Sequence, residues 1–187
     1  MSKVICFLMA SLDGYHEGTS PWSLDWHNVD EEFNEFAADQ LDASGALLFG
    51  RATYAGMAQY WPSEEARTSD PDIARRMNSA RKYVFSQTLE QPDPEWENTT
   101  LIKDVGRLKK LKEDSEKDLL VLGSSVLTTR LLERGLLDEL RIIVNPVILG
   151  QGRSLFETAT RRIPVELKST RQFRSGNVLL TYSPTKE

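Results

Sequence analysis

The chain has 187 residues, of which 40% are hydrophobic, and a formal net charge of −5. This length fits one domain with a sizeable core, which we expect to span residues 1–187. The negative charge argues against a protein that binds nucleic acid or an anionic membrane. The chain begins without the pattern of a signal peptide, and its apolar runs are shorter than the roughly 20 residues of a membrane span. A single cysteine, Cys6, excludes an intramolecular disulfide. We therefore expect a cytoplasmic protein.

Short apolar runs alternate with stretches of helical periodicity in the first hundred residues. The pattern predicts strands at residues 4–10, 46–49, 82–86 and 99–102. It predicts helices that begin after Asp30, at residues 51–60 and at 73–80. Residues 11–27 are expected to form a long loop of the kind that often binds ligands. The polar segment 63–72 is expected to be a surface connection.

The second half of the chain contains the stretch around which we organise the prediction. A helix with a solvated charged face is expected near residues 105–111, followed by a buried strand at 119–122. A turn at 123–125, a helix ending at Gly135 and a strand at 140–147 complete a βαβ unit, whose two strands should be parallel. Residues 165–174 and 177–182 predict a terminal antiparallel hairpin. The class is therefore α/β, with a mostly parallel sheet and an antiparallel C-terminal pair.

Three predicted strands end in turns rich in glycine, serine and threonine. The turns are Gly50-Arg51-Ala52-Thr53, Ser86-Gln87-Thr88 and Gly123-Ser124-Ser125. In open α/β sheets such turns share one edge, where ligands bind, and the backbone N–H groups at a helix N-terminus suit a phosphate. Arg51 offers a forked donor for phosphate and would favour NADPH over NADH. Two alternatives remain: turns of this composition also serve as ordinary helix caps, and Arg51 could belong to a surface ion pair.

These pieces resemble, in order and spacing, the dihydrofolate reductase-like superfamily, and within it the branch of the riboflavin-biosynthesis reductase domain. The matching segments are residues 11–15, 25–26, 48–54, 84–88, 123–125, 135–140, 145–152 and 155–156. The resemblance implies a mixed, mostly parallel sheet flanked by helices, and NADPH as the hydride donor. It also implies a homodimer, for which Trp96 and Tyr60, taken as exposed aromatics, are a further hint.

The resemblance assigns cofactor contacts to all three turns. Gly50, Arg51 and Thr53 would receive the cofactor phosphates, and Ser86 with Gln87 would lie beside the adenosine ribose and its phosphate. At the third turn, the pyrophosphate and the nicotinamide would contact Gly123, Ser124, Ser125 and Val126. Relatives usually have two adjacent glycines there, and in this chain Ser124 replaces the second.

The substrate side is defined by fewer residues. Asp25 beside Trp26 would provide a carboxylate and a stacking surface for a heteroaromatic ring, so Asp25 is the candidate catalytic residue. Asp30 competes with it for this role. Asp13 and Trp26 are the candidate substrate-binding residues, although Asp13 before a glycine is also typical of a turn. His16 and His27 lack partners at ligand spacing, so we expect no metal site.

These observations predict an NADPH-dependent oxidoreductase that reduces a small heteroaromatic compound, pteridine- or pyrimidine-like, or a carbonyl compound. One alternative is a true dihydrofolate reductase, against which the weak match around the catalytic carboxylate counts. The other is a non-catalytic nucleotide-binding or interaction protein that retains the fold.

Overall fold

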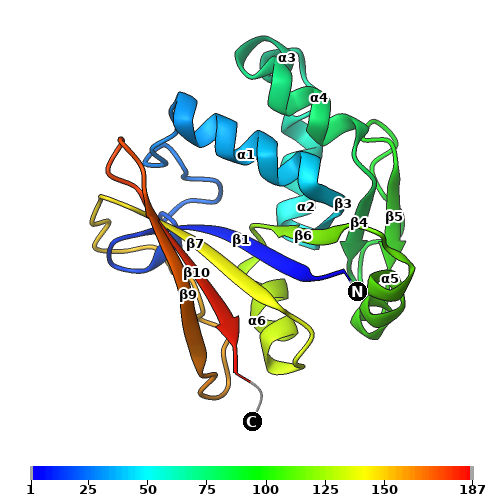
Figure 1. Cartoon of the computed structure of the whole chain (residues 1–187). Helices are drawn as coiled ribbons and strands as arrows, with labels where there is room; N and C mark the ends of the chain where they lie inside the picture. The colour runs from blue at the N-terminus through cyan, green and yellow to red at the C-terminus, as the bar shows by residue number, and fades with distance from the viewer. Residues whose placement is uncertain (1, 186–187) are drawn as a thin grey trace.

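One eight-stranded sheet runs through the protein, as the computed structural model of residues 2–185 shows (Figure 1). Its strands stand in the order β5-β4-β3-β6-β1-β7-β10-β9. They are β1 (Val4–Ser11), β3 (Ser44–Gly50), β4 (Lys82–Phe85), β5 (Thr99–Ile102), β6 (Asp118–Leu122), β7 (Glu139–Asn145), β9 (Val165–Gln172) and β10 (Val178–Pro184). Two further short strands, β2 (Tyr15–Glu17) and β8 (Arg153–Ser154), pair with each other beside it.

The strands from β5 to β7 are parallel, whereas β10 is antiparallel to β7 and β9 to β10. The predicted fold class, a mostly parallel sheet with an antiparallel C-terminal hairpin, is therefore confirmed. The predicted βαβ unit is β6, α6 (Ser125–Glu133) and β7, and β1 lies between its two strands. This order places β1 at the centre of the unit, which explains why its sequence is an almost unbroken apolar run.

Helices cover both faces of the sheet (Figure 1). Besides α6 they are α1 (Glu31–Ala43), α2 (Arg51–Tyr60), α3 (Glu64–Ser69), α4 (Pro71–Ser79), α5 (Leu108–Asp114) and the short 3-10 helix η1 (Val105–Arg107). Asp30 caps α1 as predicted, since its carboxylate accepts a hydrogen bond from the N–H of Phe33 at 2.8 Å. None of the helices in residues 2–185 is long and apolar enough to span a membrane.

Two hydrophobic cores result from the alternation of side chains along the strands. On β1, Cys6 and Leu8 face the core shared with α5 and α6, where Leu131 is fully buried. Ile5 and Phe7 face the opposite core, shared with α1, α2 and α4. The sheet is thus covered on both faces over its parallel part, and its accessible carboxyl edge is the place left for a ligand.

Two expectations need correction. The segment 63–72 is not a plain connection, because Ser63 caps α3 and Pro71 begins α4. Trp96 is not an exposed aromatic: it is 1% exposed, stacks on Tyr54, and its indole N–H donates to Asn78. The predicted C-terminal hairpin is confirmed, and all eight residues of its strand β9 are exposed at the edge of the sheet.

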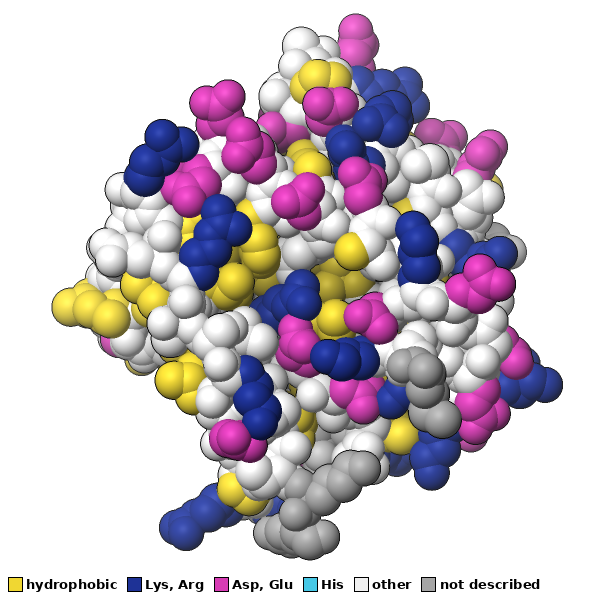
Figure 2. Space-filling view, viewed as in Figure 1, with side chains coloured by type: hydrophobic (Ala, Val, Ile, Leu, Met, Phe, Trp, Pro, Cys, Tyr) yellow, Lys and Arg dark blue, Asp and Glu magenta, His cyan; other side chains and the backbone are white. Residues whose placement is uncertain are grey.

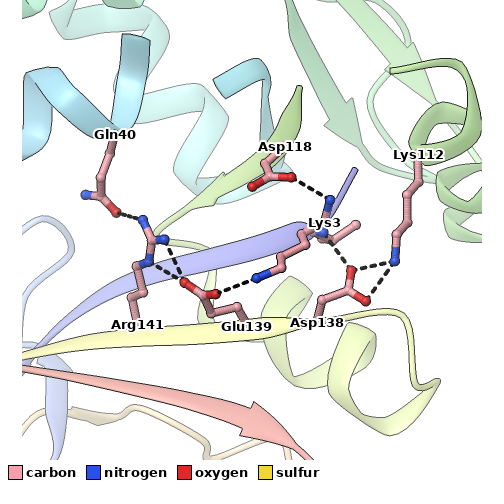
Figure 3. Close-up of polar contacts among 8 residues, drawn as sticks. Lys3, Gln40, Lys112, Asp118, Asp138, Glu139 and Arg141 are labelled. Atoms are coloured by element: carbon pink, nitrogen blue, oxygen red, sulfur yellow. Dashed lines mark hydrogen bonds and ion pairs between the residues drawn. The ribbon is translucent and has the colours of Figure 1, made fainter. Parts of the chain in front are cut away.

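A polar network ties the amino ends of several strands together (Figure 3). The carboxylate of Asp138 accepts from the N–H of Val4 at 2.7 Å and from the ammonium of Lys112 at 2.6 Å. Arg141 of β7 donates to Glu139 at 2.7 Å and reaches Gln40 of α1 at 3.0 Å. Viewed as in Figure 1, the surface carries positively and negatively charged side chains that are intermixed (Figure 2).

Candidate active site

The three predicted turns meet at one edge of the sheet. Because β4, β3 and β6 are neighbours and parallel, the turns that follow them lie side by side. All of the predicted cofactor residues line one cavity of about 1120 Å³. They are Gly50, Arg51, Thr53, Ser86, Gln87, Gly123, Ser124, Ser125 and Val126. This carboxyl edge is the usual ligand site of open α/β sheets.

Ser124 connects two of these turns. Its hydroxyl accepts a hydrogen bond from the N–H of Gly50 at 2.8 Å, 74 residues away in sequence. Gly123 and Ser124 both have φ of 58°, in the left-handed region that glycine adopts most easily. The side chain makes no capping hydrogen bond to α6. Serine therefore keeps the backbone shape that a second glycine would give, and in addition fixes the position of Gly50.

The turn after β3 presents Arg51 and Thr53 on the first turn of α2. The capping residue Gly50 provides no side-chain hydrogen bond, so donors at the helix N-terminus remain open to an anion. Within residues 2–185, Arg51 takes part in no ion pair, and its guanidinium is exposed at the cavity. A β-carbon on Gly123 would lie 3.2 Å from Cγ2 of Thr53, so these two turns are closely packed.

The turn after β4 is stabilised by its own serine. The hydroxyl of Ser86 accepts from the N–H of Thr88 at 3.2 Å and from that of Leu89 at 2.9 Å. Ser86 and Gln87 also line a smaller hollow of about 160 Å³, to which Lys103, Arg130 and Arg134 contribute. Arg130 lines both spaces. Asp104 also lines the smaller hollow, so three basic residues face one acidic residue there, and the net positive charge suits an anion.

His16 enters the site from the loop after β1. Pairing of β2 with β8 places its Nε2 atom 3.2 Å from the hydroxyl of Ser125. Burial lowers the pKa of His16, and the neighbouring charge of Arg153 lowers it further. Arg153 lines the same cavity but is paired with Glu17 at 3.4 Å and Glu157 at 2.9 Å. A neutral imidazole beside the first residue of α6 can accept or donate a hydrogen bond to a bound ligand.

The predicted substrate residues are separated by the structure. Asp25 lines the cavity and is exposed. Trp26 does not line it, and its indole N–H donates to the carbonyl of Ser23 at 2.9 Å. Asp13 also lies outside the lining; its carboxylate accepts from the N–H groups of Leu149 and Gly150 at 3.1 and 2.8 Å, and so joins two loops. The competing carboxylate of Asp30 is engaged in capping α1 and does not line the cavity.

Below the rim the cavity is mostly apolar. It continues between the sheet and the helices α1, α2 and α4, where its wall includes Met9, Phe33, Leu41, Met57, Trp61, Ile73, Met77, Leu120 and Leu122. Gln40 is a polar residue in this part of the wall. His27 also lines the cavity; burial lowers its pKa to about 4, and its buried Nε2 atom has no hydrogen-bond partner within residues 2–185.

Several lining residues could not be found from the sequence. Trp22, rather than Trp26, lines the cavity, and its backbone is left-handed with φ of 61°. Gln40, Arg130 and Arg153 belong to elements whose faces are decided by tertiary packing. His16 meets Ser125 across 109 residues, and nothing in the spacing of the sequence indicates that contact. Among residues 2–185, no three His, Cys, Asp or Glu side chains are grouped as metal ligands.

Comparison with known proteins identifies a matching family and similar proteins in Bacillus subtilis. The model of the RibD C-terminal domain matches residues 2–179. The uncharacterized protein YyaP of Bacillus subtilis is 32% identical over 182 residues, which cover 96% of this chain and 94% of YyaP. A second uncharacterized protein of that organism, YwjB, is 27% identical over 175 residues, 91% of this chain and 92% of YwjB.

Solved structures show the same fold. A putative riboflavin biosynthesis protein from Shewanella sp. PV-4 has a TM-score of 0.74 and 23% identity, and the match covers 98% of this chain and 99% of that one. Dihydrofolate reductase from Enterococcus faecalis, solved with NADP(H), has a TM-score of 0.64 and 16% identity, with 98% and 97% covered. RibD from Acinetobacter baumannii has a TM-score of 0.65 at 17% identity; the match covers all of this chain and 59% of RibD.

Proposed function

The chain belongs to the RibD C-terminal domain family, and on that premise we propose that it is an NADPH-dependent reductase of a small heteroaromatic or carbonyl compound. The observation that carries the proposal is that the turns after β3, β4 and β6 line one cavity. A reductase fold is shared with RibD and dihydrofolate reductase. The NADPH dependence and the substrate class are our inference.

The residues at the rim fit a dinucleotide. The N-terminal N–H groups of α2 and α6 would hold the pyrophosphate, for which Gly50 and Gly123 allow a close approach of the backbone. Arg51, which lines the same cavity as Ser86 and Gln87, would contact the phosphate on the adenosine ribose, and the hollow beside Ser86 and Gln87 would receive that ribose. An extra phosphate on that ribose distinguishes NADPH from NADH.

The substrate would lie in the apolar part of the cavity. A reduced nicotinamide supplies a hydride, so the chief task of the protein is to hold two reactants together and exclude water. Trp22 would contact a flat ring, and Asp25 would be the group that delivers a proton to the substrate. Asp13 and Trp26 would act only indirectly, by shaping the loops that carry these residues.

Cofactor preference tests the proposal. Titration of the protein with NADPH and NADH should show at least about tenfold tighter binding of NADPH, because one charge-assisted contact contributes roughly 1.5–3 kcal/mol. Arg51→Gln should remove most of that preference, whereas Arg67→Gln, an exposed arginine outside the cavity on α3, should leave it unchanged. Absence of binding, or equal affinity for the two cofactors, would refute the role given to this edge of the sheet.

Turnover separates the remaining alternatives. NADPH oxidation should be followed with a panel of pteridines, pyrimidines and carbonyl compounds. Reduction of dihydrofolate that is lost in Asp25→Asn would favour a true dihydrofolate reductase. Tight NADPH binding without turnover of any compound would favour a nucleotide-binding protein that retains the fold.

Assembly and location are further parts of the proposal. We expect a cytoplasmic homodimer, as the resemblance to the riboflavin-biosynthesis reductases implies. The two aromatics taken as a hint do not support it, because Trp96 is buried and Tyr60 is half-buried in the cavity lining. Light scattering of the purified protein measures the oligomeric state directly.

A further inference from the structure

We propose that the substrate arm of the cavity takes an uncharged, flat, mostly apolar compound with a hydrogen-bond acceptor at its far end, and not a phosphate ester. The substrate arm is the part of the cavity walled by β1, β6, α1, α2 and α4. Its separation from the cofactor rim rests on the proposed function. A structural neighbour from Thermotoga maritima is named as a reductase of a phosphoribosylamino-uracil. The phosphate ester makes that substrate negatively charged, whereas the compound proposed here is uncharged.

The first argument is the distribution of charge along the cavity. Among residues 2–185, the basic side chains in the lining are Arg51, Arg130 and Arg153. Arg51 and Arg130 belong to the rim, on α2 and α6 beside the phosphate-binding turns. The third, Arg153, lies on β8, which is not one of the elements that wall the substrate arm, and it is paired with Glu17 and Glu157. No lining arginine or lysine of the described chain therefore lies in the substrate arm.

The remaining charged residues of the cavity lining are the acidic Glu17, Asp25 and Asp70, and Glu17 is paired with Arg153. Asp25 lies on the loop before α1, and Asp70 precedes the first residue of α4. The rest of the wall is supplied mainly by apolar side chains of the surrounding helices and strands, such as Met57, Trp61 and Ile73. A phosphate placed here would lose its hydration without gaining a cation, which costs several kcal/mol at least.

The size of the cavity leaves room for a second ligand beside a cofactor. At about 1120 Å³, the cavity exceeds the roughly 300–1,000 Å³ typical of a single small-molecule site. Its polar rim and apolar interior are also chemically distinct. A flat hydrophobic compound would fill the interior and gain free energy from burial, at about 25 cal/mol per Å² of apolar surface.

Gln40 supplies a donor in this apolar wall. It is 7% exposed, and its amide oxygen accepts from Nη1 of Arg141 at 3.0 Å (Figure 3). Because a guanidinium only donates, this contact fixes which end of the amide is oxygen. Arg141 is in turn held by Glu139 at 2.6 Å. The amide nitrogen of Gln40 is the end left to donate to a ligand, which calls for a carbonyl oxygen or a ring nitrogen.

A matched pair of probes tests the charge selectivity. Methylcoumarin is flat, neutral and carries a carbonyl acceptor, whereas methylumbelliferyl phosphate adds a phosphate ester to the same ring system. Both should be titrated against the full chain with saturating NADPH, so that the rim is occupied, while quenching of tryptophan fluorescence is followed. We expect methylcoumarin to bind at least about tenfold more tightly. Equal or tighter binding of the phosphate ester, or no binding of methylcoumarin, overturns the proposal.

Variants of Gln40 test the acceptor. Gln40→Glu keeps a partner for Arg141 but replaces the amide donor with an acceptor, so the affinity for methylcoumarin should fall about two- to tenfold. NADPH affinity should not change. Gln59→Glu, on an exposed position of α2 outside the lining, is the matched control and should bind like the wild type. If Gln40→Glu melts early, Gln40→Met serves in its place; unchanged affinity in a folded variant refutes the role of Gln40.

The two proposals fail in different ways. If NADPH does not bind, the proposed function is wrong. The apolar site would still be supported if methylcoumarin bound to the protein without NADPH and Gln40→Glu weakened that binding. If NADPH binds and the phosphate ester is preferred, the reductase proposal survives and only the substrate class is overturned.

Discussion

Ser124 shows how one residue serves both the backbone and the site. A left-handed conformation costs a residue other than glycine roughly 1 kcal/mol or more. The hydrogen bond from the N–H of Gly50 to the serine hydroxyl offsets this cost by about 0.5–1.5 kcal/mol of stability. The same bond joins the turns after β3 and β6. Glycine would relieve the strain but lose the bond, whereas alanine would keep the strain and lose the bond as well.

Two substitutions at Ser124 should therefore differ in stability. We expect Ser124→Ala to lower the free energy of unfolding by about 1 kcal/mol, and Ser124→Gly to stay within about 0.5 kcal/mol of the wild type. Urea unfolding at constant temperature measures both. Ser79→Ala, whose hydroxyl makes only an exposed 3.3 Å contact to Arg76, is the control and should be neutral. A glycine variant less stable than the alanine variant would contradict this account.

The docking of the loop before α1 onto α2 depends on the absence of a side chain. A β-carbon on Gly56 would lie 1.8 Å from Cζ2 of Trp22, far inside any real contact. Trp22 is 45% exposed, and its backbone N–H donates to Glu17 at 2.6 Å. Gly56 thus forms the surface on which the indole rests, at the mouth of the cavity.

This contact predicts an unusual response to a helix-favouring substitution. Alanine in place of glycine inside a helix normally stabilises by about 1 kcal/mol. Gly56→Ala alone should lack that gain, because the indole of Trp22 must move. In a Trp22→Ala background the same change should stabilise by about 0.5–1 kcal/mol. Denaturant unfolding of the four proteins gives the coupling, and an equal gain in both backgrounds would show that the two residues do not interact.

At the scale of the whole molecule, one sheet is shared by both cores. Leu131 of α6 lies in one core and is fully buried, while Phe49 of β3 lies in the other. All four tryptophans, Trp22, Trp26, Trp61 and Trp96, precede residue 100 of the chain. The strands that carry the two cores are the same, so neither core can open alone without breaking the sheet.

We therefore expect one cooperative unfolding transition, in agreement with the expectation of a single domain. Leu131→Ala should lower the free energy of unfolding by about 2–5 kcal/mol and shift the tryptophan fluorescence and the far-ultraviolet circular dichroism equally. Leu167→Ala, on the exposed edge strand β9, should change it by less than about 0.5 kcal/mol. If Leu131→Ala did not shift the fluorescence transition relative to the wild type, the two cores would be independent folding units.

The strands of the main sheet, its longer helices and the shared carboxyl edge of β3, β4 and β6 could be predicted from the amino-acid sequence. Apolar runs of strand length and helical periodicities are local signals, and the parallel arrangement brings the ends of β3, β4 and β6 to one edge. The short helix α3 was missed because its signal, Ser63 before two glutamates, was interpreted as a polar connection. Trp96 was misplaced because an indole in an acidic, proline-rich loop gives no local indication of its burial.

What only the tertiary structure decided is which side chains meet within that site. The contact between Ser124 and Gly50, that between His16 and Ser125, and the selection of Trp22 over Trp26 all join segments distant in sequence or depend on a left-handed residue. Such contacts are fixed by strand pairing and by loop conformation, and neither leaves a periodic signal in the chain. The sequence therefore determined which turns share the carboxyl edge of the sheet, and the packing determined which side chains line the cavity at that edge.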